Sequence, residues 1–280
     1  VYSFDPVDEI VKTQHPDIII NCSSSPTRAK KEQLLNNMLS FVSKKHKTPI
    51  VYVNQVGAVD NISFLGSSRC YDEKGKIIAR AKSFEEQFFL LSMPTKKPAK
   101  NNLNQIFSLP SGLDKSLNEQ KAFSLDYEPD LERTYLTIIN SIRDYFKKNG
   151  FKRAVLGVSG GLDSSVCAVL LADALGNKNV YAVSMPYKIT SKESKSEDKE
   201  LCENLGINYF EIPINEMVEA SKNTFNEVFD NIEKSWDGRY TAPLTMDNIQ
   251  ARSRAMILWG ISNEFSSTIP IATSDKSELY

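Results

Sequence analysis

Hydrophobic positions in the second half of the chain alternate between short apolar runs and longer stretches with helical spacing. Arg153–Val158 and residues 179–184 are short runs typical of buried parallel strands, and between them an apolar stretch over 164–175 ends at Gly176. Further helices are predicted at 194–205, 216–229 and 246–265, with strands at 209–212 and 269–273. Alternating strands and helices with short connections predict a Rossmann-like, doubly wound parallel α/β sheet. Ligands of such sheets bind at the carboxyl ends of the strands, so we expect the segments 159–164, 185–186, 212–214 and 273–278 along one edge.

The first 91 residues carry a second alternation of strands and helices. A buried strand is predicted at 17–21 and another at Ile50–Asn54, followed by a turn at 55–57. Residues 64–71 and 76–80 read as an antiparallel pair joined by a hairpin at 72–75, and 88–91 as a last strand. A helix over 30–45 has one apolar stripe, made of Leu34, Leu35, Met38, Leu39 and Val42.

A polar segment separates these two halves. Residues 92–128 are rich in proline, lysine and asparagine and lack periodic apolar positions, which is typical of a linker. A helix follows up to Gly150, with a stripe that we expect to pack, formed by Leu131, Tyr135, Ile138, Ile139, Ile142, Tyr145 and Phe146. We therefore predict domains at 1–91 and 129–280, joined by the linker at 92–128.

Composition and charge narrow the class of protein. The chain has 280 residues, of which 41% are hydrophobic and 25% charged, which suffices for a sizeable core. A net charge of −1 gives no electrostatic reason to expect nucleic acid or a membrane as partner. The four cysteines are scattered, without zinc-ligand spacing, which favours a reducing, cytoplasmic location. The chain starts without methionine and stops in mid-pattern, so we expect a piece of a longer protein.

Candidate chemistry is concentrated between the strand Arg153–Val158 and the helix after it. Gly160 and Gly161 have no Cβ, so a phosphate chain can approach the backbone closely at a helix N-terminus, where amides and the dipole favour an anion. Ser159, Ser164 and Ser165 add hydroxyl donors. Asp163 would repel phosphate unless a cation lay between them, so it predicts a magnesium ion bridging to phosphate.

The segment 159–164, with the sequence SGGLDS, resembles the signature of the ATP pyrophosphatases, which cleave ATP between the α and β phosphates. It is not the common P-loop, because no lysine followed by serine or threonine comes after the glycines. The resemblance implies that ATP is bound by the following residues: Gly157, Val158, Ser159, Gly160, Gly161, Leu162, Asp163, Ser164, Met185 and Thr273.

Three later segments indicate to which family of ATP pyrophosphatases the chain is similar. Residues 185–194, 247–254 and 272–279 resemble those of NAD synthetases, which activate deamido-NAD as an adenylate and amidate it with ammonia. The resemblance implies that Asn248, Arg252, Arg254 and Glu278 contact deamido-NAD, and that Asp163 and Glu278 hold Mg²⁺. The family continues beyond Glu278 with a segment that this chain lacks.

The first 91 residues are similar to the C-terminal half of a nitrilase-type glutaminase, which implies a partial αββα sandwich. The similarity rests on five segments, at 21–26, 54–57, 66–68, 75–79 and 83–86. That family uses a Cys nucleophile, a Glu and a Lys, all of which we expect upstream of Val1, so this half has no catalytic residues of its own. Cys22 has no activating partner placed by sequence, and we expect a buried structural cysteine.

Together the two resemblances imply a glutamine-dependent NAD synthetase that uses ATP, Mg²⁺, deamido-NAD and either glutamine or ammonia, and that assembles as a homo-oligomer. Two alternatives stay open. The chain could belong to another glutamine amidotransferase of the ATP pyrophosphatase class, such as a GMP or asparagine synthetase, although a nitrilase-type partner domain argues against both. It could also be a nucleotide-binding fragment without activity.

Overall fold

The computed structural model describes residues 6–28, 30–91, 93, 130–188, 192–232 and 243–274. The chain divides into two compact units, Val1–Ser141 and Ile142–Tyr280. The expected linker at 92–128 lies outside the described residues except for position 93, so the division into 1–91, 92–128 and 129–280 stays a prediction.

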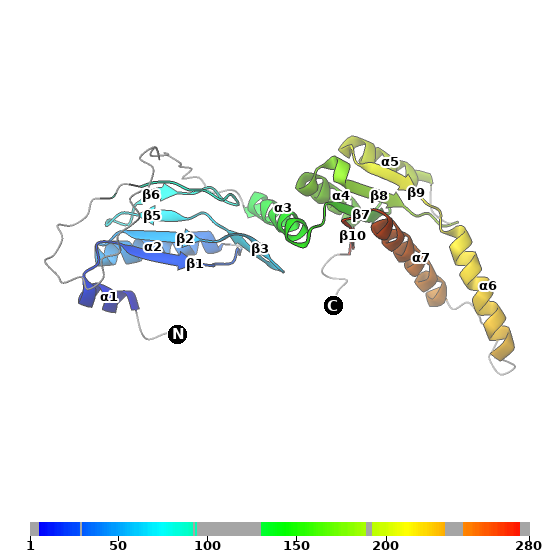
Figure 1. Cartoon of the computed structure of the whole chain (residues 1–280), viewed down its shortest axis with the longest axis horizontal. Coiled ribbons are helices and arrows are strands. Elements are labelled where there is room, and N and C mark those ends of the chain that lie inside the picture. Colours follow the sequence, from blue (N-terminus) through cyan, green and yellow to red (C-terminus); the bar gives the residue numbers. More distant parts are fainter. Residues whose placement is uncertain are drawn as a thin grey trace. The chain divides into compact units, whose positions relative to one another are not determined.

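The first unit contains a mixed sheet with the strand order β1-β2-β5-β6 (Figure 1). β1 runs parallel to β2, whereas the β2–β5 and β5–β6 pairs are antiparallel. A separate antiparallel pair is formed by β3 and β4. The elements are α1 (Pro6–Gln14), β1 (Ile19–Ser23), α2 (Lys31–His46), β2 (Ile50–Asn54), β3 (Val56–Val59), β4 (Ile62–Leu65), β5 (Arg69–Tyr71) and β6 (Ile77–Arg80).

Helix α2 covers this sheet with only part of its predicted stripe. Leu35 and Leu39 are buried against Ile50, Tyr52 and Tyr71 of the sheet, with Val42 packed beside them. Two other members of the predicted stripe are exposed, Leu34 at 70% and Met38 at 49%. The reason is geometric. Successive residues on a helix are about 100° apart, and the predicted apolar stripe is wider than the face of α2 that contacts the sheet.

Two predictions of burial in this unit are wrong. The run at 17–21 becomes β1, but Ile20 is 63% exposed. Cys22, expected to be a buried structural cysteine, is exposed on the same strand. Among the described strands β1 lies at the edge of the sheet and pairs only with β2, so its apolar composition alone did not fix its environment.

Three predictions of local structure in this unit also differ. The turn expected at 55–57 is the start of β3, and the single strand expected at 64–71 is divided between β4 and β5 at Gly66, whose φ is +71°. The apolar run at 88–91 forms no strand. The hairpin at 72–75 is confirmed, with the Gly75 N–H donating to the carbonyl of Asp72 at 3.0 Å.

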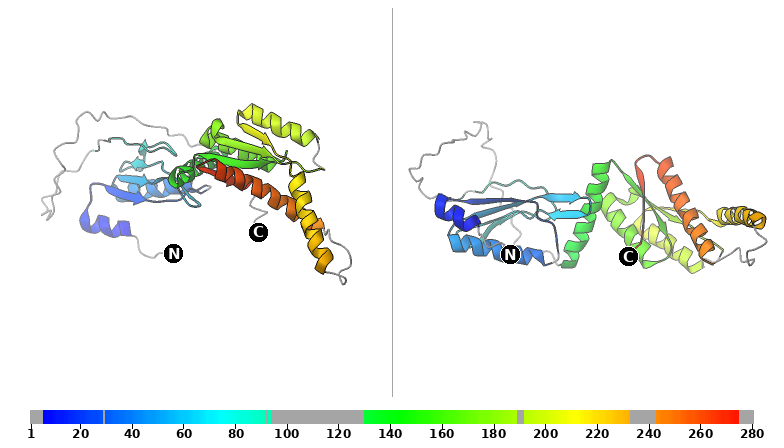
Figure 2. Two further views of the ribbon diagram at one scale, coloured as in Figure 1. Left: turned by 45° about the vertical axis from the view of Figure 1, so that its right-hand side comes forward. Right: turned by 90° about the horizontal axis from the view of Figure 1, so that it is seen from below.

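The second unit is built on a wholly parallel sheet with the strand order β10-β7-β8-β9 (Figures 1 and 2). This confirms the predicted parallel α/β sheet, and Arg153–Val158 has the predicted bounds. The elements are α3 (Asp130–Asn149), which begins before this unit, then β7 (Arg153–Val158), α4 (Leu162–Leu175), the short 3₁₀ turn η1 (Asn177–Asn179), β8 (Val180–Ser184), α5 (Lys192–Leu205), β9 (Asn208–Glu211), α6 (Asn215–Ile232), α7 (Pro243–Glu264) and β10 (Thr268–Ile271).

Helices cover both faces of this sheet, as Figure 2 shows. Leu156 and Ala182 lie in a core with α4 and α5, whereas Val155 and Val183 lie in a second core with α6 and α7. Side chains of a strand alternate between faces, so near-continuous apolar strands supply both cores.

The predicted apolar stripe of α3 packs only in part. Ile139 and Phe146 are buried and Ile142 packs against the first core, but the rest of the stripe is exposed, namely Leu131, Tyr135, Ile138 and Tyr145.

A matched pair of leucine substitutions tests this packing. Leu156 is 0% exposed and Leu162 is 78% exposed. Leu156→Ala should lower the free energy of unfolding by about 2–5 kcal/mol because it leaves a cavity in the core. Leu162→Ala should change it by less than about 0.5 kcal/mol. Urea unfolding followed by tryptophan fluorescence reports on this unit, since Trp236 and Trp259 both belong to it, and equal effects of the two substitutions would contradict the packing.

Candidate active site

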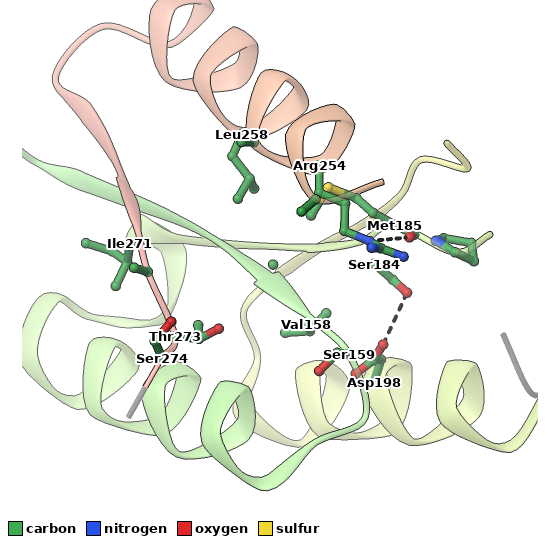
Figure 3. Close-up of a pocket in the computed structure, with 15 residues that line it drawn as sticks. Val158, Ser159, Ser184, Met185, Asp198, Arg254, Leu258, Ile271, Thr273 and Ser274 are labelled. Atoms are coloured by element: carbon green, nitrogen blue, oxygen red, sulfur yellow. Dashed lines mark hydrogen bonds between the residues drawn. The ribbon is translucent and has the colours of Figure 1, made fainter. Parts of the chain in front are cut away.

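A cavity of about 620 Å³ lies at the carboxyl ends of β7, β8 and β10. The strand order reverses at β7, which has β8 on one side and β10 on the other. In open parallel sheets, ligands bind in the crevice at such a reversal point. Figure 3 shows residues from each wall of the cavity: Ser159 follows β7, Ser184 ends β8, Thr273 follows β10, and Arg254 descends from α7.

Gly157 lines this cavity from within strand β7. A Cβ at this position would lie 3.0 Å from Cε of Met185 and 4.0 Å from Cδ1 of Leu258. A glycine inside a strand often marks a place where a ligand or another chain comes close to the backbone. Its missing side chain therefore keeps open the part of the cavity between Met185 and Leu258.

The turn from β7 into α4 depends on one glycine. Gly160 has φ of +73°, in the left-handed region that favours glycine, whereas Gly161 has φ of −88° and directly precedes the helix. Ser164, buried at 3% exposure, accepts a hydrogen bond from the Ser159 N–H at 3.4 Å and donates one to the Gly161 carbonyl at 3.0 Å. Ser165 donates to the same carbonyl at 2.9 Å. The hydroxyls of Ser164 and Ser165 therefore stabilise the turn.

The first turn of α4 presents backbone donors that could bind an anion. The earliest bond of this helix runs from the Ser165 N–H to the Gly161 carbonyl. The preceding amides, from Leu162 to Ser164, are the N–H groups for which a helix supplies no acceptor. Together with the helix dipole they form a candidate phosphate site at the end of β7.

Asp163 lies in this first turn and is exposed. It forms no hydrogen bond or ion pair with any described residue, which leaves its carboxylate available to a cation. Glu278, the second predicted metal ligand, lies outside the described residues. Within the described part of the chain, no group of three or more His, Cys, Asp or Glu side chains could hold a metal, so the metal site stays a prediction that rests on Asp163.

Asp198, on α5, lines the candidate site but is not among the residues that the sequence predicted. Its side chain lines the cavity and is 3% exposed. One carboxylate oxygen accepts the Gly160 N–H at 2.7 Å, and the other accepts the Ser184 hydroxyl at 3.1 Å. Burial raises the pKa of the Asp198 carboxyl, and the two hydrogen bonds oppose that shift only in part. The Gly160 amide, predicted to face phosphate, is therefore already engaged.

A sequence signal for Asp198 does exist. It precedes the buried Cys202 by four residues, which places both on one face of α5. An acid on the buried face of a helix that follows a strand of the sheet is a candidate site residue. The surrounding charged residues of α5 concealed this pattern.

Arg254 supplies the cavity with a positive charge. Its Nε donates to the carbonyl of Met185 at 3.2 Å, as Figure 3 shows, and it forms no ion pair with a described residue. Burial lowers the pKa of the Arg254 guanidinium, which nonetheless stays charged, as arginines in proteins do. A half-buried guanidinium without an acid partner is suited to an anionic ligand.

The other two described candidates for deamido-NAD lie elsewhere. Asn248 and Arg252 line a second cavity of about 440 Å³ between α6 and α7, where Nη1 of Arg252 donates to the side-chain carbonyl of Asn248 at 2.8 Å. Arg252 and Arg254 are two residues apart on a helix and therefore face different sides of α7. The structure thus does not bring the predicted deamido-NAD residues into one cavity.

One predicted member of the site edge is part of the core. Residues 212–214 follow β9 and were expected to lie with the other strand ends at the edge of the site. Ile214 is instead 0% exposed and packs with Val155 and Val218.

None of the helices in the described ranges is long and apolar enough to cross a membrane.

This fold and this site define a candidate phosphate-binding α/β domain, with a glycine turn at a helix N-terminus and a cavity beside it. A family model described as NAD synthase matches residues 134–280. The chain therefore belongs to the NAD synthase family.

Similar proteins extend the match beyond these residues. A glutamine-dependent NAD(+) synthetase of Aquifex aeolicus is 34% identical over 98% of this chain and 49% of its own length, and one from Synechocystis is 32% identical over 99% and 45%. The solved structure of the glutamine-dependent NAD+ synthetase from Acinetobacter baumannii, in complex with adenosine diphosphate, matches with a TM-score of 0.77 and 28% identity, over 98% of this chain and 46% of that one. The chain thus spans about half the length of these relatives.

The two glycines of the turn provide a test of its geometry. Gly160→Ala should destabilise the second unit by about 1–2 kcal/mol, because an L-residue is strained at positive φ. Gly161→Ala is the control, since its φ is −88° and the added Cβ would lie 3.3 Å from the Ser159 hydroxyl, a side chain that can rotate. Urea unfolding followed by tryptophan fluorescence measures both, and a Gly161→Ala loss as large as that of Gly160→Ala would contradict the turn described above.

Proposed function

We propose that the whole protein is a glutamine-dependent NAD synthetase, which converts deamido-NAD to NAD at the expense of ATP. The observation that carries the proposal is the cavity at the carboxyl ends of β7, β8 and β10, which is lined by Ser159 of the glycine turn, by Arg254 and by Thr273. Its support from relatives is the similarity to curated glutamine-dependent NAD(+) synthetases along 98% and 99% of this chain.

ATP is the ligand that we assign to this cavity. Its volume of about 620 Å³ lies within the range of small-molecule sites, about 300–1,000 Å³. The amides of the first turn of α4 would bind phosphate, and the Arg254 guanidinium would neutralise its charge. Gly157 leaves room for a flat group against the backbone, next to Met185. The adenosine diphosphate complex of the Acinetobacter baumannii relative supports a nucleotide here.

The proposed reaction has two steps. An oxygen of the nicotinate carboxylate attacks the α-phosphorus of ATP, the bond between the α-phosphorus and the bridging oxygen breaks, and pyrophosphate leaves. Ammonia then attacks the acyl carbon of the adenylate, AMP leaves with the electron pair of the broken C–O bond, and the nitrogen loses one proton to solvent to give the amide. Negative charge grows around the α-phosphate in the first step, where preorganised amides and Arg254 stabilise it best.

Magnesium fits the same proposal. When bound, Mg²⁺ neutralises phosphate charge and helps pyrophosphate to leave. Asp163 would hold the ion, because its carboxylate is exposed beside the candidate phosphate site. Glu278 is the second ligand that the sequence implies.

For deamido-NAD we propose the second cavity, where Asn248 and Arg252 lie side by side. Arg254 was assigned to deamido-NAD by resemblance, but it lines the other cavity, so we propose it as an ATP contact. A dinucleotide is long enough to bridge separate subsites, which is compatible with residues on two sides of α7.

The first unit is proposed to be part of a nitrilase-type glutaminase that supplies ammonia. Support comes from the five sequence segments named above and from a mixed sheet covered by α2. The Cys, Glu and Lys of glutamine hydrolysis would belong to sequence upstream of Val1. The resemblance further implies a cytoplasmic homo-oligomer.

The experiment that tests the function uses the full-length protein with ATP, Mg²⁺, deamido-NAD and either glutamine or ammonium, and measures NAD and AMP. NAD from both nitrogen donors is the expected result. NAD from ammonium alone would remove the glutaminase from the proposal. AMP formed with another acceptor, such as xanthosine monophosphate, would favour a different amidotransferase, and a lack of any AMP would favour a fragment that only binds nucleotide.

Substitutions of the two arginines separate the two cavities. Arg254→Ala should raise the KM for ATP by about 10- to 100-fold, since hydrogen bonds to charged groups contribute about 1.5–3 kcal/mol. Arg252→Ala is the matched control on the same helix and should raise the KM for deamido-NAD while leaving that for ATP nearly unchanged. Steady-state kinetics of NAD formation with ammonium would show this, and the reverse pattern would contradict the assignment.

A further inference from the structure

We propose that Asp198 is a positioning residue, which sets the conformation of the phosphate-binding turn by hydrogen bonding to Gly160. This inference rests on the proposed function, because it concerns how the same nucleotide site is held ready for ATP. It gives a role to a side chain that the resemblance to NAD synthetases did not single out.

The geometry links three elements through one carboxylate. Asp198 projects from α5 and holds the Gly160 N–H at 2.7 Å with one oxygen and the Ser184 hydroxyl at 3.1 Å with the other. Gly160 lies in the turn after β7, and Ser184 is the last residue of β8. The rigid ends of two neighbouring strands and a helix are thereby fixed to the turn.

The bond to Gly160 decides which amides face the ligand. Gly160 has φ of +73°. A glycine can adopt many other backbone conformations of similar energy, so this one has to be selected by its contacts. When the Gly160 N–H donates to Asp198, the residues after Gly160 continue directly into α4. The amides of the first turn of α4, which have no acceptor within the helix, then lie at the end of β7. A site whose donors are in place before the ligand arrives loses less entropy on binding.

Simple stabilisation does not account for a carboxylate at this position. The side chain is 3% exposed, and the core on the same face of α5 includes Cys202. Burying a carboxylate carries a large desolvation penalty, and an apolar residue in such a place is often as stable or more so. What an apolar residue could not do is accept the Gly160 N–H.

The role requires hydrogen-bond acceptors and not a negative charge. A charge here would repel phosphate, and burial raises the pKa of this carboxyl, which disfavours the charged form. An asparagine has the same shape, its carbonyl can accept the Gly160 N–H, and its amide can donate to the Ser184 oxygen. Asp198→Asn should therefore preserve the turn, whereas Asp198→Ala should release it.

The test compares Asp198→Ala and Asp198→Asn in the full-length protein, with Cys202→Ala as the control on the same face of the same helix. The affinity for α,β-methylene-ATP is measured by calorimetry, and the KM for ATP and for deamido-NAD in NAD formation with ammonium. Asp198→Ala should weaken nucleotide binding and raise the KM for ATP by about tenfold or more, since small displacements of binding groups cost up to about 100-fold. The KM for deamido-NAD should change less than about twofold, because Asp198 does not line the cavity assigned to that ligand.

Asp198→Asn should stay within about threefold of the wild type for ATP, as a residue that keeps both hydrogen bonds should. Cys202→Ala should lower thermal stability without changing the KM for ATP. Three results would overturn the proposal: wild-type nucleotide affinity in a folded Asp198→Ala protein, an Asp198→Asn protein as weak as Asp198→Ala, or an equal rise in the KM for ATP with Cys202→Ala.

If Asp198→Ala does not fold, the hydrogen bond is tested by the exchange rate of the Gly160 amide proton in the other proteins. Slow exchange in the wild type and in Asp198→Asn is expected, and fast exchange in the wild type would contradict the bond. If the wild type binds the ATP analogue but forms no NAD, the proposed function fails while the role of Asp198 is still tested by binding. If the wild type binds no nucleotide, both proposals fall.

Discussion

The turn between β7 and α4 is the constraint on which the candidate site depends. A buried strand ends, the chain reverses at a left-handed glycine, and a helix begins at once. Ser164 and Asp198 hold the two sides of this turn, one from within α4 and one from α5. The consequence is that the unpaired amides at the start of α4 lie beside the cavity at the strand ends, where a phosphate group can meet them.

Helix α7 divides the second unit into two chemical environments. Its side toward β7 and β10 carries Arg254 and lines the larger cavity, whereas its side toward α6 carries Asn248 and Arg252 and lines the smaller one. A single helix thus presents an arginine to each of two cavities, and apolar residues of the same helix pack in the core. For the proposed reaction, in which a nucleotide is joined to the carboxylate of a dinucleotide, two cavities that share one rigid helix would help to orient the reactants.

The larger cavity contains two ionisable side chains that differ in their hydrogen bonding, the buried Asp198 and the half-buried Arg254. Asp198 is satisfied by protein donors and has no need of a ligand. Among the described residues, Arg254 donates one hydrogen bond, from Nε to the Met185 carbonyl, out of the five N–H donors that a guanidinium has. The electrostatic character of the cavity is therefore set by the cation, which agrees with a polyphosphate ligand.

The sequence by itself determined the strand and helix order of the second unit, the bounds of β7, and the glycine turn, because these depend on local apolar periodicity and on residues such as Gly160 whose conformation is a local matter. It also predicted that the candidate site lies at the carboxyl ends of the strands, since a parallel sheet brings these ends to one edge. Only the tertiary structure decided which side chains meet there. It buried Asp198 in a helix that reads as charged, put Arg254 and Arg252 on different sides of α7, moved Ile214 into the core, and left Ile20 and Cys22 exposed on an edge strand. Burial and partnership are properties of neighbours that are distant in the chain, and a local pattern of apolar and polar residues cannot specify those neighbours.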